Sequence, residues 1–161
     1  MSLQYIIDAY NLINHPQFKP VNKVVLGKAR LLVDFISCHK LSGSKNNRVT
    51  IVFDGYPLSG EIPPQERGMI CVFSRMLEAD EIIKKLIEAS GERKNIIVVS
   101  DDKEVQLAAK LLHARVCPVQ EFICGKKRSN FSLSQDSSND DELSYSKKQQ
   151  INAELKEKWL K

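Results

Sequence analysis

Short apolar runs recur along the chain as far as about residue 119. Each is flanked by glycine, proline or polar residues, and such runs are typical of strands buried on both faces of a parallel sheet. They predict strands at residues 3–7, 49–53, 69–73, 96–99 and 115–119.

Between these runs, apolar residues recur at intervals of three and four, which is the period of an amphipathic helix. The pattern predicts helices over residues 21–38, around 79–87 and around 105–112, with one further helical turn at 121–124. Strands that alternate with helices form parallel sheets joined by right-handed crossovers. We therefore expect a three-layer α/β/α fold with a central, mainly parallel five-stranded sheet.

The composition changes after residue 125. A basic run at 126–128 precedes a Ser-, Asn- and Asp-rich stretch with too few apolar residues to order itself. Ile151, Leu155 and Trp159 then recur every four positions, which predicts a helix that docks on the domain, on a partner or on RNA. The expected organisation is a folded domain over 1–125, a polar flexible linker over 126–145 and an amphipathic C-terminal helix over 146–161.

Composition narrows the class of protein. The chain has 161 residues, 42% of them apolar, and a formal net charge of +4, values that are ordinary for one globular domain. It has neither a run of 18 apolar residues nor a signal-peptide pattern, so we expect a cytoplasmic protein without a membrane anchor. Its four cysteines form no C-x-x-C pair, which argues against a structural zinc site.

Acidic residues stand at the ends of the predicted strands or open the helices that follow. They are Asp8, Asp54, Asp80, Glu81, Asp101 and Asp102. All carboxyl ends of a parallel sheet lie along one edge, where ligands bind in such folds. We therefore expect these six acids to share that edge.

Gathered carboxylates repel one another. Two unit charges about 4 Å apart repel by ~4 kcal/mol at an effective dielectric constant of 20. A hard divalent cation removes this repulsion and prefers oxygen ligands. Such an ion also polarises a phosphate and activates a bound water for attack, so the acids predict a metal-dependent phosphate chemistry.

Helix capping is the competing explanation. Acids stabilise the first turn of a helix, and Asp101 with Glu104 three residues later resembles a capping box. Asp54 precedes a Gly-Tyr-Pro turn and Asp8 lies well before the first expected helix, so capping does not account for these two. Asn11 either orients a metal-bound water or forms an ordinary Asx turn.

Four short motifs occur in the order and spacing of a known family. They are Asp8-Ala9-Tyr10-Asn11-Leu12, Val52-Phe53-Asp54, Ala79-Asp80-Glu81 and Val99-Ser100-Asp101. From about Leu3 to Phe122 the chain resembles the NYN domains, in particular the YacP-like branch of the PIN-like nuclease superfamily. It departs from that branch at Ala9, where glycine is usual, and at Gly55-Tyr56, two changes that bear on turn geometry and substrate fit.

The resemblance implies a PIN-like fold and a Mg²⁺- or Mn²⁺-dependent endoribonuclease, in a branch that includes ribosome-associated enzymes acting on mRNA. By position, it implies a catalytic and metal-holding set of Asp8, Asp80 and Asp101, with Asn11 in support. Further candidate ligands are Asp54, Glu81 and Asp102.

Cations are candidates for contacts to RNA phosphates, which position nucleic acid without reading its sequence. They are Arg30, Arg75, Lys103, Lys126, Lys127 and Arg128. For the first three, the competing interpretation is a solvated helix face. The three histidines show none of the pairing that a metal-free ribonuclease needs.

Three functions are compatible with the sequence. The first is a single-strand-specific endoribonuclease that leaves a 5′-phosphate and a 3′-hydroxyl. The second is a non-catalytic module that binds RNA or a ribosome, and the third is an interaction protein that works through its C-terminal helix. The complete acid set favours the first, because such charges without a cation would only destabilise the fold. The sequence leaves the oligomeric state open.

Overall fold

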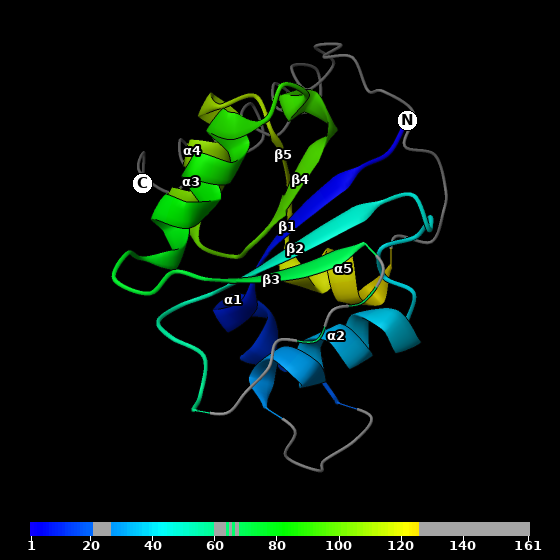
Figure 1. The fold of residues 1–161 in the computed structure, drawn as a ribbon. Coiled ribbons are helices and arrows are strands. Elements are labelled where there is room, and N and C mark those ends of the chain that lie inside the picture. Colours follow the sequence, from blue (N-terminus) through cyan, green and yellow to red (C-terminus); the bar gives the residue numbers. More distant parts are fainter. Residues whose placement is uncertain (21–26, 60–63, 65, 67, 126–161) are drawn as a thin grey trace, which may run out of the picture. The chain divides into compact units, whose positions relative to one another are not determined.

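The computed structural model describes residues 1–20, 27–59, 64, 66 and 68–125. At its centre lies a sheet with the strand order β3-β2-β1-β4-β5, in which every pair of neighbours is parallel (Figure 1). The strands are β1 (Gln4–Asp8), β2 (Arg48–Phe53), β3 (Met69–Phe73), β4 (Ile96–Val99) and β5 (Arg115–Cys117). The expected five-stranded parallel sheet is confirmed.

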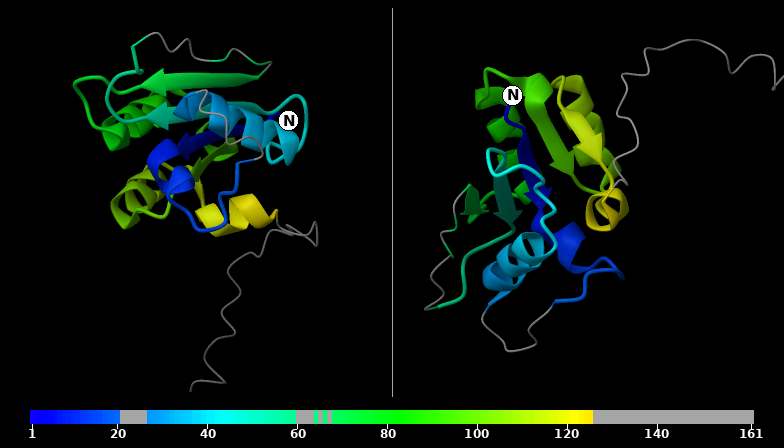
Figure 2. Two further views of the ribbon diagram at one scale, coloured as in Figure 1. Left: turned by 90° about the horizontal axis from the view of Figure 1, so that it is seen from below. Right: turned by 90° about the vertical axis from the view of Figure 1, so that its right-hand side faces the viewer.

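Helices cover both faces of the sheet (Figure 1 and Figure 2). One face carries α1 (Ala9–Ile13), α2 (Lys28–Cys38) and α5 (Val119–Cys124), and the other carries α3 (Ala79–Ala89) and α4 (Lys103–Leu111). A 3₁₀ turn, η1 (Arg93–Asn95), leads into β4. The expected three-layer α/β/α arrangement is confirmed.

The alternation of side chains along each strand divides the core into two layers. Ile7 packs in the layer that contains Leu32 of α2. Its neighbour Ile6 packs in the other layer, with Ile83 of α3. Asp8 follows Ile7 in the same strand, so its side chain belongs to the side of the sheet that faces α3.

Several elements differ from the sequence expectation. Helix α1 was not expected, and it starts directly after β1. Helix α2 begins at Lys28, after a Gly27 N-cap with φ of 88°, and residues 21–26 of the expected helix lie outside the described residues. Strand β5 ends before Pro118, which has no N–H for the sheet, and α5 therefore starts at Val119, earlier than the single turn expected at 121–124.

Some expectations concern the end of the chain. The expected linker at 126–145 and the expected helix at 146–161 both lie outside the described residues. Among the helices in the described ranges, none combines the length and the apolar character needed to cross a membrane.

Candidate active site

The strand order places the acid-bearing strands side by side. Strand β1 lies between β2 and β4, with Asp8 opposite Val52 and Ile7 opposite Val99. Asp54 and Asp101 each follow two residues after those partners, just beyond the ends of strands that lie about 4.8 Å from β1. The chain also changes direction across the sheet between β1 and β4, and such a switch point is where parallel sheets bind ligands. Asp8 therefore occupies the centre of the carboxyl edge.

Asp8 is held rigidly at that centre. Its side chain is only 6% exposed. Its Oδ1 accepts the backbone N–H of Tyr10 at 3.1 Å, and its Oδ2 accepts the side-chain amide of Asn11 at 2.6 Å. Asp8 is thus the N-cap of α1. Capping therefore does account for Asp8, contrary to the sequence expectation, because this five-residue helix starts directly after the strand.

Capping does not neutralise the carboxylate. Burial raises the pKa of Asp8, the hydrogen bonds from Asn11 and Tyr10 oppose that rise, and the nearby charge of Asp80 adds to it. Within the described residues, no lysine, arginine or histidine lies within ion-pair distance of Asp8. A buried, unpaired carboxylate is costly, so the site favours a cation.

Asp80 and Glu81 lie in the first turn of α3, where acids complement the helix dipole. Asp80 is partly buried and close enough to Asp8 for its charge to act on that carboxyl group. Glu81 is exposed. The charge of Asp80 thus acts on the Asp8 carboxyl group, whereas Glu81 has no such effect on its pKa.

Asp101 and Asp102 both serve as caps. Asp101 Oδ1 accepts the N–H of Val119 at 3.0 Å, at the start of α5. Asp102 is the N-cap of α4, and its Oδ1 accepts the N–H of Glu104 at 2.8 Å. The capping role expected for Asp101 on this helix therefore belongs to Asp102. Both carboxylates are exposed, and each has a second oxygen that can accept from a ligand.

Two serines to which the sequence analysis assigned no role support the acids. Ser74, only 4% exposed, donates its hydroxyl to Asp54 Oδ1 at 3.0 Å and accepts the N–H of Gly55 at 2.9 Å. Ser100 is fully buried, and its hydroxyl accepts the N–H of Asp102 at 3.1 Å. Each serine directly follows the last residue of a strand, and this position was the available signal.

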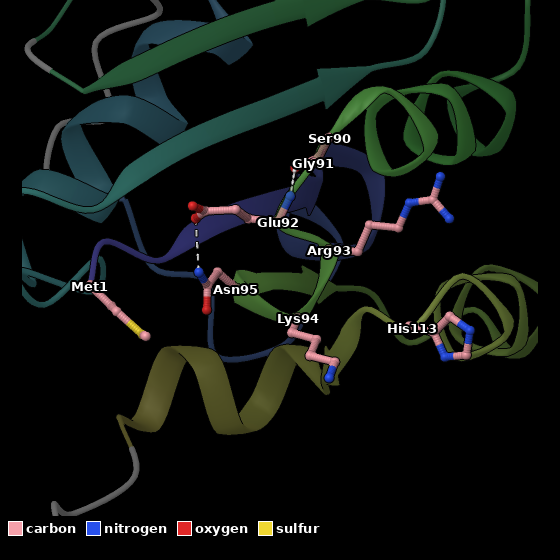
Figure 3. Close-up of a pocket in the computed structure, with 8 residues that line it drawn as sticks. All are labelled: Met1, Ser90, Gly91, Glu92, Arg93, Lys94, Asn95 and His113. Carbon is pink, nitrogen blue, oxygen red and sulfur yellow. Dashed lines mark hydrogen bonds between the residues drawn. The ribbon is translucent and has the colours of Figure 1, made fainter.

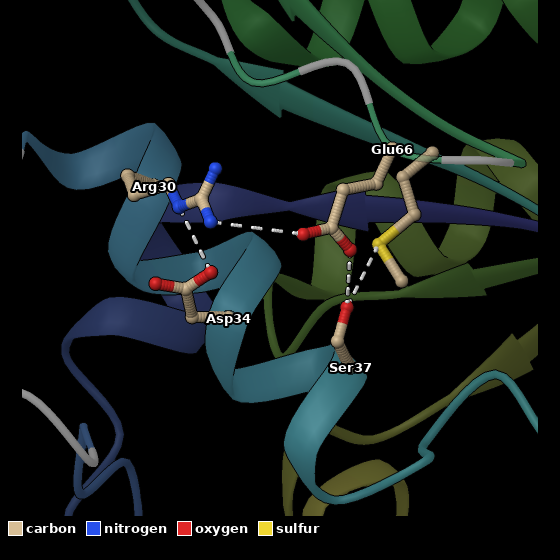
Figure 4. A network of polar contacts seen from close by, with 5 residues as sticks. Arg30, Asp34, Ser37 and Glu66 are labelled. Atoms are coloured by element: carbon tan, nitrogen blue, oxygen red, sulfur yellow. Dashed lines mark hydrogen bonds and ion pairs between the residues drawn. The ribbon is translucent and has the colours of Figure 1, made fainter.

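The predicted phosphate-binding cations fall into three groups. Arg30 has two acidic partners (Figure 4): its Nε lies 2.9 Å from Asp34 Oδ1, and a second guanidinium nitrogen lies 4.0 Å from Glu66. Arg75 and Lys103 are exposed and follow the carboxyl ends of β3 and β4. Lys126, Lys127 and Arg128 lie outside the described residues.

Hollows occur at both edges of the sheet. At the carboxyl edge, one of about 140 Å³ is lined by Tyr10, Lys28 and Asp54, among others. At the amino edge, one of about 670 Å³ is lined by Arg93, Lys94 and other residues of the segment between α3 and β4 (Figure 3). The larger hollow therefore lies at the edge opposite the candidate acids.

The arrangement of the acidic side chains can be compared with what the expected metal ion requires. Across the described part of the chain, no three His, Cys, Asp or Glu side chains are arranged as a ready-made metal site. Mg²⁺, however, usually takes one or two carboxylates and keeps waters or phosphate oxygens in its other positions. The buried Asp8 beside Asp80 fits an ion held in that way, and it does not fit a closed protein cage.

Together these features define a three-layer α/β protein whose acidic carboxyl edge surrounds one buried carboxylate. The model of the YacP-like NYN domain matches residues 5–161, and the chain belongs to this family. The expected resemblance is thereby confirmed, and the family indicates a nuclease-type, RNA-related function.

Solved structures agree with the fold. The crystal structure of Rae1 (YacP) from Bacillus subtilis is 22% identical, with a TM-score of 0.58 over 98% of this chain and 81% of that chain. A tryptophan-to-leucine variant of Rae1 is 24% identical, with a TM-score of 0.57 over 77% of this chain and 74% of that chain. No curated protein sequence matches this chain. At these identities the solved structures support the fold alone.

Proposed function

We propose that the protein is a metal-dependent endoribonuclease that hydrolyses phosphodiester bonds of RNA at the carboxyl edge of its sheet. The observation that carries this proposal is Asp8, a buried carboxylate beside Asp80 with no cationic partner among the described residues. The family supports it, because it is a nuclease-type family.

Each residue of the site has a proposed role. Asp8 and Asp80 would hold Mg²⁺ or Mn²⁺, and Asp101 would bind through the oxygen that does not cap α5. When bound, the metal supplies Lewis acidity and a water of lowered pKa. Asn11 acts as a positioning residue, since its amide fixes the Asp8 carboxylate. The further candidate ligands would lie at the rim of the site. They are Asp54, Glu81 and Asp102.

Cations would position the RNA. Arg75 and Lys103 are exposed just beyond β3 and β4, where they can meet phosphates on either side of the acids. Lys126, Lys127 and Arg128 would extend this contact from the segment that follows α5. Arg30 is a weaker candidate, because Asp34 and Glu66 already engage its guanidinium group.

The cellular setting belongs to the same proposal. We infer a cytoplasmic enzyme that acts on mRNA in contact with the ribosome, with a nuclease domain at 1–125, a flexible linker at 126–145 and a partner-binding helix at 146–161. Deletion of residues 129–161 tests this organisation. Loss of ribosome co-sedimentation with retained cleavage of free RNA would support it, and unchanged co-sedimentation would contradict it.

Cleavage of mixed single-stranded RNAs in Mn²⁺ or Mg²⁺ tests the activity. The native chain should leave 5′-phosphate and 3′-hydroxyl ends, and EDTA or Asp8→Asn should abolish cutting. Glu92→Gln, which removes a carboxylate from the amino edge, is the matched control and should cut normally. Cleavage that persists in both EDTA and Asp8→Asn would overturn the proposal.

A non-catalytic RNA-binding module is the second candidate. It is favoured by the lack of a ready-made three-ligand site in the described part of the chain. This candidate predicts that the native chain binds RNA and leaves it intact in Mn²⁺, even at high enzyme concentration. The same assay therefore separates the two candidates.

A further inference from the structure

We propose that the hollow beside α1 is a nucleobase subsite, in which Tyr10 stacks on one base of single-stranded RNA and Lys28 contacts an adjoining phosphate. The inference rests on the proposed function and deepens it, because it assigns residues that select unpaired RNA. Neither Tyr10 nor Lys28 is among the acids and cations considered so far.

The size of the hollow suits one ring of a longer molecule. Its volume is about 140 Å³, whereas sites for whole small ligands usually measure about 300–1,000 Å³. A ligand that exceeds the hollow must leave most of its atoms in solvent. A polymer that inserts one base and keeps its backbone outside meets that condition.

Tyr10 presents an aromatic ring from a fixed backbone. Its side chain is 71% exposed, although Ala9 and Leu12 in the same short helix are buried. Its N–H is bonded to Asp8 Oδ1 at 3.1 Å, and its carbonyl accepts the side-chain amide of Asn14 at 3.0 Å. The backbone that carries the ring is therefore anchored beside the buried carboxylate, and the exposed ring is accessible for a base to stack on.

Lys28 places a positive charge at the N-terminus of α2, where the helix dipole disfavours a cation. It is the first residue of α2 and is exposed, and the first turn of that helix contains no acid. The positive end of a helix dipole repels a cation and attracts an anion. Lys28 and this helix end therefore both favour a phosphate at the rim of the hollow.

Asp54 determines which part of the nucleotide enters. It lines the same hollow, and Ser74 holds one of its oxygens. A carboxylate repels phosphate but accepts the N–H groups of bases. The base therefore enters the hollow, and the phosphate stays near Lys28.

The hollow and the Asp8 carboxylate lie on opposite sides of the sheet. Its lining residues Ile13 and Phe53 belong to the layer of α1 and α2, whereas Asp8 faces the layer of α3. A base in the hollow and a phosphate at Asp8 would thus lie on opposite sides of the end of β1. A duplex cannot separate one base from its partner in this way without unpairing.

Binding measured without cleavage tests the subsite. Fluorescence anisotropy of a labelled single-stranded RNA of eight nucleotides is recorded with the full chain in EDTA. Tyr10→Ala and Tyr10→Leu should raise the Kd by about 5- to 100-fold, and Tyr10→Phe should restore the affinity. Lys28→Gln should lower the slope of log K against log salt by about 0.7. Leu107→Ala, at a residue that is 60% exposed on α4, is the control.

The outcomes separate this inference from the proposed activity. A Tyr10→Ala variant that binds as tightly as the native chain, or a Tyr10→Leu variant that binds as tightly as Tyr10→Phe, would overturn the stacking role. An unchanged salt slope in Lys28→Gln would overturn the phosphate contact. If the native chain does not cleave RNA in Mn²⁺ but the Tyr10 and Lys28 variants still show the expected changes in RNA binding, the proposed nuclease activity is refuted. The proposed subsite is then still supported.

Discussion

The two edges of one sheet differ in the charged residues that they gather, and among the described residues only the carboxyl edge holds a buried carboxylate. The carboxyl edge gathers Asp8, Asp54, Asp80, Asp101 and Asp102. At the amino edge, hollows of about 670 and 260 Å³ are lined by three cations and one carboxylate, together with uncharged residues. The charged residues are Arg48, Arg93, Lys94 and Glu92. Helix dipoles explain part of this difference, because α3 and α4 begin at the carboxyl edge and end at the amino edge.

Burial separates the edges more clearly than charge does. At the amino edge, polar groups satisfy one another in solvent: Arg93 donates to the Glu88 carbonyl at 3.1 Å and Asn95 to Glu92 at 2.9 Å. At the carboxyl edge, Asp8 is buried with no cation beside it among the described residues. The buried carboxylate, and not the size of a hollow, therefore distinguishes the edge at which we propose the active site.

The largest effect among these predictions should come from neutralising the acid whose charge acts on Asp8. Asp80→Asn should slow RNA cleavage by at least about 100-fold, because it removes a charge that the metal and the transition state need. Lys94→Gln at the amino edge should stay within about twofold of the native rate. Single-turnover kinetics in Mn²⁺ provide the measurement. An equal loss of cleavage rate in both variants would mean that the two edges do not differ in function.

A substitution of Asp101 tests whether this residue binds a metal or only caps α5. Asp101→Asn keeps an oxygen that can accept the N–H of Val119, so its melting temperature should match that of the native chain. Its cleavage rate should fall by roughly 10- to 100-fold, the range seen when one supporting group of a metal site is lost. A native rate together with a native melting temperature would show that Asp101 only caps α5.

The same glycine substitution should act differently at the two edges. Gly68 at the amino edge has φ of +80°, and an added Cβ would lie 3.1 Å from the Asn47 carbonyl oxygen. Gly68→Ala should therefore cost about 2 kcal/mol of unfolding free energy and leave the cleavage rate of the folded protein unchanged. Urea unfolding and kinetics measure the two quantities.

Gly55 at the carboxyl edge is the counterpart. Its φ is +79°, and an added Cβ would meet no heavy atom within 4 Å, so Gly55→Ala should cost only about 1 kcal/mol. Its N–H bonds to Ser74 and its carbonyl accepts the N–H of Arg75 at 2.8 Å. A backbone shift at position 55 should move Asp54 and slow RNA cleavage. Equal cleavage rates of the folded Gly55→Ala and Gly68→Ala variants would argue against a link between Gly55 and the site.

The sequence predicted the layers of the fold because strand and helix periods differ. It could not predict α1, since five residues are too few to show a helical period. Strand order was also out of reach, because it depends on which crossovers pack best. For that reason the central place of Asp8 between the strands of Asp54 and Asp101 emerged only from the structure.

Side-chain pairing explains the other differences at the site. The sequence offered Arg30 as a phosphate ligand, yet Asp34 stands four residues later in the same helix, a spacing that favours an ion pair. Lys28 was overlooked although it lies two residues earlier and lines the hollow with Tyr10. Composition identifies cations, but the availability of each one depends on its neighbours in space.

The smallest expected effect concerns stability, and it tests whether burial of Asp8 is a cost that only a cation relieves. Because burial raises the pKa of Asp8 in the folded state, the unfolded chain loses this proton first, near pH 3.9. Stability contributed by the group is therefore present at low pH, falls as the pH rises from the unfolded to the folded pKa, and stays reduced above it. In EDTA at pH 7, Asp8→Asn should melt a few degrees above the native chain, a gain of about 0.5–2 kcal/mol.

Thermal unfolding between pH 4 and 8 checks that sign. The advantage of Asp8→Asn should shrink toward pH 4, because protonation of Asp8 removes the buried charge from a growing fraction of native molecules. Mn²⁺ should raise the melting temperature of the native chain alone, because ligand binding to the folded state stabilises it by mass action. A native chain that is the more stable of the two in EDTA at pH 7 would mean that hydrogen bonds from Asn11 and Tyr10 already compensate the charge. The buried carboxylate would then create no requirement for a metal, and the contrast between the two edges would reduce to helix dipoles.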